Sequence, residues 1–407
     1  MSAAAGTTLN TRCCIVGGGP AGMMLGLLLA RAGVMVTVLE KHADFLRDFR
    51  GDTVHPSTLQ ILDELGLLQK FAQLPQRRVD HLDGIVGGHP QPLIDFRGLK
   101  PFAYLALVPQ WDFLDLLASE GRLHAGFDLR MSHAATGLLQ ENGRVTGVQV
   151  QGPDGPFEIH ADLVVACDGR RSTMREAADL HAHEYGAPMD VLWFRLPRAS
   201  SDPQDTFGII DRGRMMVLLN RTEYWQAAYL VPKGGDAALR AQPIGAFGDS
   251  VAELAPFLAD RTSVLTSWDQ ASTLQVQVDR LPRWHRPGLL LIGDAAHAMS
   301  PIGGVGINLA VQDAVAAANA LARPLLAGGA IDEALLAQVQ RRREWPTRVV
   351  QAVQRAVQRR VISRALAQNG RPLRVPVVLR ALLRYRVVRH IPARLFGYGL
   401  RQEHVRC

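Results

Sequence analysis

Residues 290–314, LLIGDAAHAMSPIGGVGINLAVQDA, hold the densest group of chemically useful residues in the chain. An apolar strand ends at Gly293 and Asp294, and a helix is expected to begin near Asn308. A carboxylate at a strand tip accepts hydrogen bonds from hydroxyl groups, and glycines let a flat ring approach the backbone. Free amide groups at the start of a helix favour negative charge on a ligand. The stretch therefore indicates a site for a ligand with hydroxyl groups and a flat polar edge.

The same stretch contains a histidine and an alanine-rich helix. His297 could serve as an acid or base, but we favour a structural histidine held by hydrogen bonds. The small residues from Ala310 to Ala318 allow the helix to pack closely on its neighbours.

A second glycine cluster lies in residues 13–41, CCIVGGGPAGMMLGLLLARAGVMVTVLEK. Gly17, Gly19 and Gly22 match G-x-G-x-x-G, whose glycines make the turn, admit a pyrophosphate and let the helix pack on the strand. The pyrophosphate would lie at the helix N-terminus. The pattern predicts strands over 13–16 and 34–39 and a helix over 23–31.

Glu40 follows the second of these strands and can accept hydrogen bonds from a ribose 2′-OH. A carboxylate there would repel a 2′-phosphate, so this motif favours FAD or NAD over NADP. No second G-x-G-x-x-G follows a strand. We therefore expect one dinucleotide to have a dedicated domain and any other to bind transiently.

A third strand tip lies at Asp168. The pattern predicts a hairpin over 145–159 and a strand over 163–167, followed by Asp168 and Gly169. The ligand sites of open α/β sheets lie at the carboxyl ends of their strands. We therefore expect Glu40, Asp168 and Asp294 to converge.

The composition is that of a globular protein, with 407 residues, 47% hydrophobic and 20% charged. This length favours two or three domains. The four cysteines show no Cys-x-x-Cys spacing, so neither a disulfide framework nor a zinc ribbon is expected. The first dozen residues lack a signal-peptide pattern, and the apolar run at 23–30 is too short to span a membrane, so we expect a cytoplasmic protein.

These motifs together resemble the single-component FAD-dependent aromatic hydroxylases, the flavoprotein monooxygenases of the p-hydroxybenzoate hydroxylase type. The matching stretches are the G-x-G-x-x-G turn, CDGRRS at 167–172 and GDAAHAMSPIGGVGIN at 293–308. Residues 50–68 and 108–118 also resemble that family. The resemblance covers about residues 10–330, and the last motif is the most specific.

The resemblance implies a role for the residues around the nucleotide and the ribityl chain. Glu40 would bind the adenosine ribose, with Lys41 nearby, and Asp294 would bind the ribityl chain. Arg50 and Gln110 would contact the flavin side of FAD. Asp168 belongs to a motif that the family links with both FAD and NAD(P)H.

The resemblance also implies which residues border the flavin ring. Pro301 and Gly304 would border the flavin and oxygen pocket. Gly306 would border the ring, and Ile307 and Asn308 would face its pyrimidine edge. Val305 departs from the family, in which many members have a polar residue.

The family's chemistry implies tightly but non-covalently bound FAD, reduced transiently by NADH or NADPH. O2 would then add at flavin C4a, and the hydroperoxide would hydroxylate a phenolic, quinolone or polyketide-like aromatic. The sequence does not choose among these substrates or between the two reductants, and it specifies neither an oligomeric state nor a catalytic acid or base.

Other functions remain open. Flavin halogenases share the first motif, but their Trp-x-Trp-x-Ile-Pro stretch is absent. A flavoprotein reductase acting on isoprenoid double bonds is an enzymatic alternative. A non-catalytic accessory protein that binds flavin or an intermediate is another.

The expected fold is α/β: a Rossmann-like FAD-binding domain with an inserted β-sheet substrate domain and a C-terminal helical region. We expect the FAD domain to comprise residues 10–75, 100–180 and 281–330. The substrate sheet would comprise 76–99 and 181–280, and the basic helical region 331–407.

Candidates to line the substrate pocket come from the strand-rich segment 181–280, where core or edge packing is the alternative for each. Arg195 or Arg214 could pair with an acidic substrate, but no residue matches a carboxylate anchor. The candidates are Trp193, Arg195, Met215, Tyr224, Trp225, Trp268 and Gln275.

The last 67 residues are strongly basic, with 17 arginines and two glutamates in 341–407. Val349, Val353, Val357 and Val361 recur at every fourth residue and predict an amphipathic helix. We favour a helical cap packed on the FAD domain. Peripheral contact with an anionic membrane is an alternative, and nucleic-acid binding is not expected because no recognition motif is present.

Overall fold

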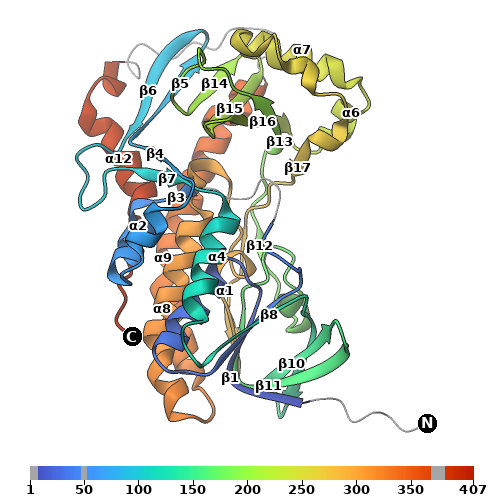
Figure 1. The fold of residues 1–407 in the computed structure, drawn as a ribbon, viewed down its shortest axis with the longest axis vertical. Helices are drawn as coiled ribbons and strands as arrows, with labels where there is room; N and C mark the ends of the chain where they lie inside the picture. Colours follow the sequence, from blue (N-terminus) through green and yellow to red (C-terminus); the bar gives the residue numbers. More distant parts are fainter. Residues whose placement is uncertain (1–7, 47–52, 368–380) are drawn as a thin grey trace.

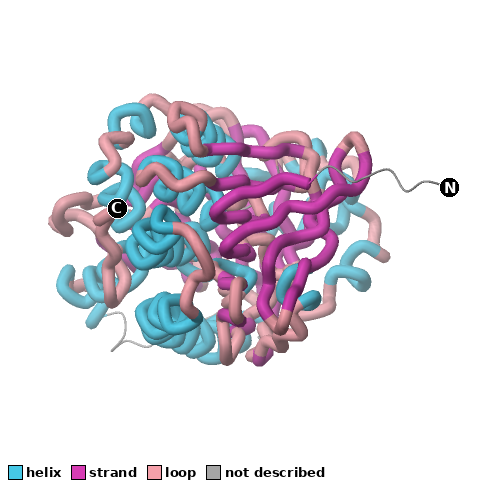
Figure 2. The backbone as a smooth tube through the Cα atoms, turned by 90° about the horizontal axis from the view of Figure 1, so that it is seen from below, coloured by secondary structure: helices cyan, strands magenta, loops and turns pink. Residues whose placement is uncertain are grey.

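The computed structural model describes residues 8–46, 53–367 and 381–407. Two β-sheets lie toward opposite ends of the long axis, and two long helices run side by side along that axis (Figure 1). These helices are α8 (Gly306–Ala327) and α9 (Glu333–Val357). Seen along the axis, strands gather on one side and helices on the other (Figure 2).

The first sheet contains eight strands in the described residues, and five neighbours, in the order β20-β11-β1-β2-β8, run parallel. Antiparallel β19 extends one edge, while β10 and β9 branch from the first half of β11. The strands are β1 (Thr8–Val16), β2 (Val36–Glu40), β8 (Phe127–Met131), β9 (Ala134–Glu141), β10 (Arg144–Gly152), β11 (Gly155–Ala166), β19 (His285–Arg286) and β20 (Leu289–Leu291).

Successive side chains of β1 point to opposite faces of this sheet, and both faces are buried. Cys13 and Ile15 belong to the core shared with α1 (Pro20–Arg31), α4 (Gln110–Gly121) and α8. Cys14 and Val16 face the opposite way, into a core with β10, β20 and Trp284. Because both faces are buried, the parallel strands are continuously apolar.

The sequence anticipates most of these elements, with shifts at their ends. Helix α1 begins at Pro20, and α8 begins at Gly306, earlier than the expected 23 and 308. β11 is one continuous strand over residues that the pattern divides in two. Its first part pairs with β10 and its last part with β20, so both predicted segments belong to it.

The second sheet contains seven strands in the described residues, in the order β17-β13-β16-β15-β14-β5-β6. It combines an early hairpin with strands that follow more than 100 residues later, and β14 pairs in parallel with β5. The strands are β5 (His81–Val86), β6 (His89–Asp95), β13 (Met189–Pro197), β14 (Phe207–Asp211), β15 (Arg214–Asn220), β16 (Tyr224–Pro232) and β17 (Ser272–Leu274).

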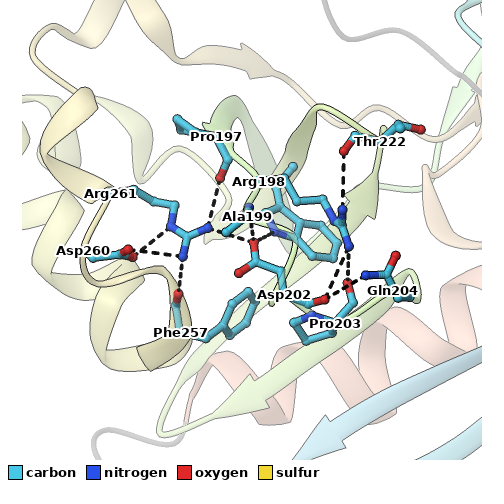
Figure 3. A network of polar contacts seen from close by, with 11 residues as sticks. Pro197, Arg198, Ala199, Asp202, Pro203, Gln204, Thr222, Phe257, Asp260 and Arg261 are labelled. Carbon is cyan, nitrogen blue, oxygen red and sulfur yellow. Dashed lines mark hydrogen bonds and ion pairs between the residues drawn. The ribbon is translucent and has the colours of Figure 1, made fainter.

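One face of this sheet is covered by α6 (Asp236–Arg240) and α7 (Ile244–Leu254), helices that the strand-rich reading of 181–280 does not anticipate. Phe194, Trp225 and Phe247 pack in this core. At its edge a buried Asp202 pairs with Arg261, which also contacts Asp260 (Figure 3).

Smaller elements join the two sheets. β3 (Thr53–Val54), β7 (Leu105–Leu107) and β4 (Arg77–Val79) form a three-stranded sheet, and β12 (His183–Glu184) pairs with β18 (Asp279–Arg280). The short helices α2 (Pro56–Glu64), α3 (Leu68–Ala72) and α5 (Thr173–Ala177) follow β3, α2 and β11 respectively.

The basic C-terminal segment continues α9 through a π-helical turn, Gln358–Ile362, into α10 (Ser363–Leu366), and α12 (Arg386–Gly397) follows. α9 packs against α8, and α12 packs against β6. The segment therefore packs both on α8, which covers the first sheet, and on β6 of the second sheet.

The buried face of α9 differs from the predicted valine stripe. Val349, Val353 and Val357 are only half-buried and Val361 is exposed. A polar stripe is buried in their place, because its side chains hydrogen bond to backbone groups of the neighbouring loops. This stripe comprises Arg343, Thr347, Gln351, Gln354 and Gln358.

One apolar stretch, Ile302–Ala327, is long enough to cross a membrane by length and composition. It includes α8, and 83% of the tested window is buried inside the protein. α8 is therefore a core helix, packed between α1 and α9.

Candidate active site

A cavity of about 1970 Å³ connects the carboxyl edge of the first sheet with the second sheet. Glu40, Asp168 and Asp294 all line it, so the three strand tips share one cavity, as the parallel strand order predicts. Ligand sites usually enclose about 300–1,000 Å³. The cavity therefore has room for a large cofactor and a second molecule.

The glycine turn before α1 forms one end of this cavity. Gly17 has φ +107°, and a Cβ there would lie 2.5 Å from the Cys167 carbonyl oxygen. A Cβ on Gly22 would lie 2.0 Å from the Gly17 oxygen, so both positions require glycine. Gly19 has open space within 4 Å and lines the cavity.

The first amide groups of α1 are available to a ligand. Gly19 is the N-cap and makes no side-chain capping bond, and Pro20 occupies the first turn. An uncapped N-terminus beside open space is the geometry that binds a pyrophosphate.

Glu40 is a nearly buried carboxylate beside that turn. One oxygen accepts a hydrogen bond from the Gly18 amide at 3.1 Å, and the other accepts from the His42 amide at 3.0 Å. These bonds fix the carboxylate at the cavity wall, next to Lys41, which also lines it. A ribose hydroxyl could donate to the fixed oxygens.

Asp294 forms an ion pair with Arg170 at the opposite side of the same wall. The Arg170 Nε donates to Asp294 Oδ2 at 2.9 Å. Within residues 8–46, 53–367 and 381–407, the buried Nη1 of Arg170 has no hydrogen-bond partner. A hydroxyl-rich ligand at this pair would satisfy that nitrogen while donating to the carboxylate, which fits a ribityl chain.

The carboxylate of Asp168 is used mainly within its own loop. It accepts from the Ser172 hydroxyl at 2.6 Å and from the Met174 amide at 3.2 Å. Burial raises the pKa of Asp168, and these hydrogen bonds oppose that rise. Asp168 therefore shapes the cavity edge by holding the start of α5.

The loop at Pro301–Gly306 lines the middle of the cavity. Gly304 has φ +61°, and a Cβ there would lie 2.8 Å from the Thr53 hydroxyl oxygen. A Cβ on Gly303 would lie 3.1 Å from the ring of Phe396 in α12. The glycines hence let this loop lie between α12, β3 and the cavity, where a flat ring could stack.

The start of α8 offers backbone rather than side-chain contacts. Its N-cap, Val305, makes no side-chain capping bond, and Gly306 and Ile307 line the cavity. Asn308 does not line it. Its side-chain oxygen accepts from Ser57 and Thr58, at 2.5 and 2.7 Å, so any contact of Asn308 with the ring would come from its backbone.

Gln110 and Arg50 are the two residues predicted to contact the flavin side of FAD. Gln110 lines the cavity at the first turn of α4. Arg50 lies outside the described residues. The position of Gln110 therefore agrees with a cofactor role.

The sequence patterns did not identify His55, a buried residue beside the loop Pro301–Gly306, which we call the ring-binding loop. Its Nε2 donates to the Gly303 carbonyl at 2.8 Å. Burial lowers the pKa of His55 to about 4, and the backbone hydrogen bonds oppose that change. His55 is therefore neutral at physiological pH, and its only sequence signal is its place in the family-like stretch 50–68.

His297 is structural in its contacts. Its Nε2 donates to Asp313 at 2.6 Å, and Asp313 also accepts from the Arg343 Nε at 2.9 Å. Burial opposes ionisation of Asp313, but contacts with His297 and Arg343 lower its pKa overall. His297 does not line the cavity. This network links the Gly293–Asp294 turn to α8 and α9, since the Gly293 amide also donates to Asp313.

Three glutamines of the C-terminal helix hold the ring-binding loop from behind. Gln351 donates to the carbonyls of Asp279 and Ala298, and Gln354 donates to those of Ser300 and Ile302. Gln358 donates to the Ser300 hydroxyl at 3.0 Å. The predicted buried face of this helix rested only on the spacing of its valines, and these glutamines were therefore not identified from the sequence.

The second sheet forms the other wall of the cavity with one of its two faces. Trp193, Met215 and Gln275 line the cavity, as expected for pocket residues. Around them the wall is largely apolar, and its further members are Leu82, Leu93, Val191, Val217, Leu219, Ala228, Leu230 and Val276.

The other four pocket candidates do not line the cavity. Trp225 is fully buried on the opposite face of β16, where its Nε1 donates to Asp202. Trp268 packs on Phe247 of α7. Arg195 lies over the Tyr224 ring, 4.9 Å from its centroid and beyond the cavity end. For these four residues the alternative, core or edge packing, holds, and alternation along β16 turns Trp225 away from the cavity.

A phosphate-binding turn, a ribose carboxylate and a glycine-rich ring loop on one cavity define a dinucleotide-binding α/β protein, and the residues present fit FAD. A family model described as an FAD binding domain matches residues 10–353. The chain belongs to this family, and within it to the FAD-dependent aromatic monooxygenases.

Named relatives support that placement. The chain is 35% identical to 6-methylpretetramide 4-monooxygenase of Streptomyces rimosus, over 76% of this chain and 74% of the relative. It is 26% identical to para-nitrophenol 4-monooxygenase of Pseudomonas sp. (strain WBC-3), over 75% and 76%. It spans only 60% of the length of the 12-dehydrotetracycline 5-monooxygenase/anhydrotetracycline 6-monooxygenase of Streptomyces rimosus subsp. rimosus, at 31% identity and 74% coverage of this chain.

Solved structures share the fold. OxyS anhydrotetracycline hydroxylase from Streptomyces rimosus superimposes with a TM-score of 0.75 over 96% of this chain and 76% of its own, at 25% identity. The p-nitrophenol 4-monooxygenase PnpA from Pseudomonas putida DLL-E4 gives 0.77 over 97% and 99%, at 22% identity, which shows the fold alone.

Proposed function

We propose that the protein uses NAD(P)H and O2 to hydroxylate a multi-ring, polyketide-like aromatic substrate. The observation that carries this proposal is the size and lining of the cavity. At about 1970 Å³ it exceeds the usual range for one ligand, and its wall on the second sheet is mainly apolar. The name of the 35% identical relative, which acts on 6-methylpretetramide, supports a substrate of several fused rings.

We propose the following division of labour. Residues 10–75, 100–180 and 281–330 bind FAD, and residues 76–99 and 181–280 provide the substrate sheet. Residues 331–407 hold the ring-binding loop in place between them. The membership of the two sheets and the glutamine contacts of α9 support this division.

In this proposal FAD supplies the redox chemistry, namely reduction by NAD(P)H and oxygen activation as the expected flavin hydroperoxide. The chain binds and orients it. The α1 N-terminus would hold the pyrophosphate, Glu40 the ribose and Asp294 the ribityl hydroxyls. The uncapped α8 N-terminus would favour negative charge on the nearby ring edge. The apolar wall would exclude water from the reacting side.

NAD(P)H is proposed as a transient reductant because no second nucleotide motif is present in the sequence. Glu40 concerns only the tightly bound nucleotide, so the choice between NADH and NADPH is left to experiment. We also propose a cytoplasmic location, supported by free cysteines at positions 13, 14, 167 and 407.

The test is substrate-stimulated turnover under ¹⁸O2. We expect slow NAD(P)H oxidation alone, strong stimulation by 6-methylpretetramide or a related polycyclic phenol, and one ¹⁸O atom in the product. Product oxygen from water would contradict a monooxygenase. Reduction of the added compound without oxygen incorporation would favour a reductase, and binding without NAD(P)H oxidation would favour an accessory protein.

A further inference from the structure

Two arginines of the C-terminal helix enter the cavity from the side of the substrate sheet. Arg360 lies in the π-helical turn after α9, and Arg364 lies in α10. Both line the cavity, together with Val357, Val361 and Ile362. A basic segment that sequence analysis assigned to a cap therefore contributes a wall of the pocket.

The turn that carries them is fixed against both halves of the site. Ile362 is buried among Met189, Val191 and Val276 of the substrate domain, and it shares this core with Ile302 of the ring-binding loop. α10 contacts β15, whose residues Met215 and Val217 line the cavity. Arg360 and Arg364 hence lie at the rim of the cavity, where both residues are also exposed to solvent.

About half of the other arginines of this segment have a side-chain partner, whereas Arg360 and Arg364, like Arg359, have none among the described residues. Arg342 pairs with Glu403, Arg343 pairs with Asp313, and Arg355 lies 4.3 Å over the Tyr185 ring. Across the part of the chain that the structure describes, Arg360 and Arg364 make no hydrogen bond, ion pair or ring contact. Four residues apart, they lie on about the same helix face, where like charges repel.

Three acidic lining residues at the nucleotide end of the cavity are already used, while Asp83 and Glu184 also line the cavity. Glu40 and Asp168 accept hydrogen bonds from the chain, and Asp294 pairs with Arg170. An unpaired double positive charge beside an apolar wall is complementary to an amphipathic anion, with rings on the sheet and a charged oxygen at the rim.

We propose that Arg360 and Arg364 form an anchor for an anionic oxygen of the substrate, such as a carboxylate or an ionised enol. This inference rests on the proposed function, since it names a feature of the substrate for that pocket. The anchor would set which end of a multi-ring substrate reaches the Pro301–Gly304 loop. It therefore concerns orientation and specificity.

The test is a binding measurement on the oxidised holoenzyme with a matched pair of probes. One probe is 4,5-dihydroxyanthraquinone-2-carboxylate, and the other carries a hydroxymethyl group in place of the carboxylate. Both are titrated by the change in flavin absorbance. The variants are R360Q, R364Q, R360Q/R364Q and, as a control for the single variants, R359Q, which removes one positive charge from a position that does not line the cavity.

We expect the unaltered enzyme to bind the carboxylate more tightly than the hydroxymethyl probe. R360Q/R364Q should weaken carboxylate binding at least about tenfold, or about 1.4 kcal/mol, and leave the hydroxymethyl probe unchanged. R359Q should leave both unchanged. Absence of a carboxylate preference in the unaltered enzyme, or equal losses for both probes, would overturn the anchor.

A second arm separates substrate from reductant, because nicotinamide nucleotides are also anions. The KM for NADH and for NADPH is measured for the same variants. A loss confined to the nucleotides would overturn the proposal in favour of a reductant-docking role. If the carboxylate preference depends on both arginines but no compound is hydroxylated, the anchor stands and the proposed function fails.

Discussion

Replacing Gln354 by leucine should loosen the ring-binding loop from the C-terminal helix. Its side-chain amide donates to the Ser300 carbonyl at 3.0 Å and to the Ile302 carbonyl at 2.8 Å, and the residue is fully buried. Each buried carbonyl left without a donor costs about 1–3 kcal/mol. Leucine has nearly the same size and returns about 1 kcal/mol through apolar burial. With two carbonyls affected, we expect a net loss of about 1–5 kcal/mol.

The measurement is urea unfolding together with FAD affinity. Q354L should lower the free energy of unfolding by that amount and weaken FAD binding at least about tenfold, because the loop would move to satisfy its carbonyls. The matched control is Q338L on the exposed face of the same helix, which should change stability by less than about 0.5 kcal/mol. Unchanged stability and unchanged FAD affinity in Q354L would refute a positioning role for these glutamines.

Four further outcomes follow from the structure. D294A should lose most of its bound FAD, measured by the flavin-to-protein absorbance ratio, while its far-UV circular dichroism stays that of the folded protein. Full FAD occupancy in D294A would contradict a role of Asp294 in FAD binding. R343M should destabilise the protein by about 3–5 kcal/mol in denaturant unfolding, because Asp313 would keep a buried charge with one partner fewer. The pKa of His55 is lowered from 6.5 to about 4 in the folded protein. As pH falls below about 6.5, His55 therefore takes up a proton in the unfolded chain before it does in the folded one. The free energy of unfolding should fall by about 3 kcal/mol between pH 6.5 and 4. Comparing the free energy of unfolding of the unaltered protein and of H55Q at each pH separates the His55 contribution from that of buried carboxylates. The same pH dependence in the two proteins would contradict this contribution. Deletion of residues 341–407 should give insoluble or flavin-poor protein in a solubility and absorbance assay, and a soluble truncated form with full FAD would show that the segment is dispensable.

The C-terminal segment shows where a one-dimensional pattern misleads. Valines at every fourth residue predicted its buried face, yet the structure buries Arg343, Gln351 and Gln354. Apolar periodicity assumes that the partner surface is apolar. Here the partner is a loop whose carbonyl groups face the helix and accept hydrogen bonds from its side-chain amides. The membrane-contact alternative has no support from the comparisons, and these arginines and glutamines pack within the protein.

The nucleotide end of the site could be predicted from the sequence because its geometry is local. Gly17 to Glu40 form one strand–turn–helix–strand unit, in which covalent spacing alone places the glycines, the helix N-terminus and the carboxylate. The motif at 293–308 is local for the same reason. Its exception is Asn308, whose side chain is taken by Ser57 and Thr58, about 250 residues away in sequence.

The substrate end was decided by the tertiary structure, because its wall is assembled from segments distant in sequence. β5 and β6 join strands that follow more than 100 residues later, and alternation in that sheet turns Trp193 toward the cavity and Trp225 away from it. Arg360 reaches the same cavity only because α9 packs along α8 and α10, which follows it, contacts β15. The sequence by itself determined the cofactor motifs and the α/β class, since these depend on short-range spacing. Which side chains meet the substrate depends on long-range packing, and no spacing along the chain specifies it.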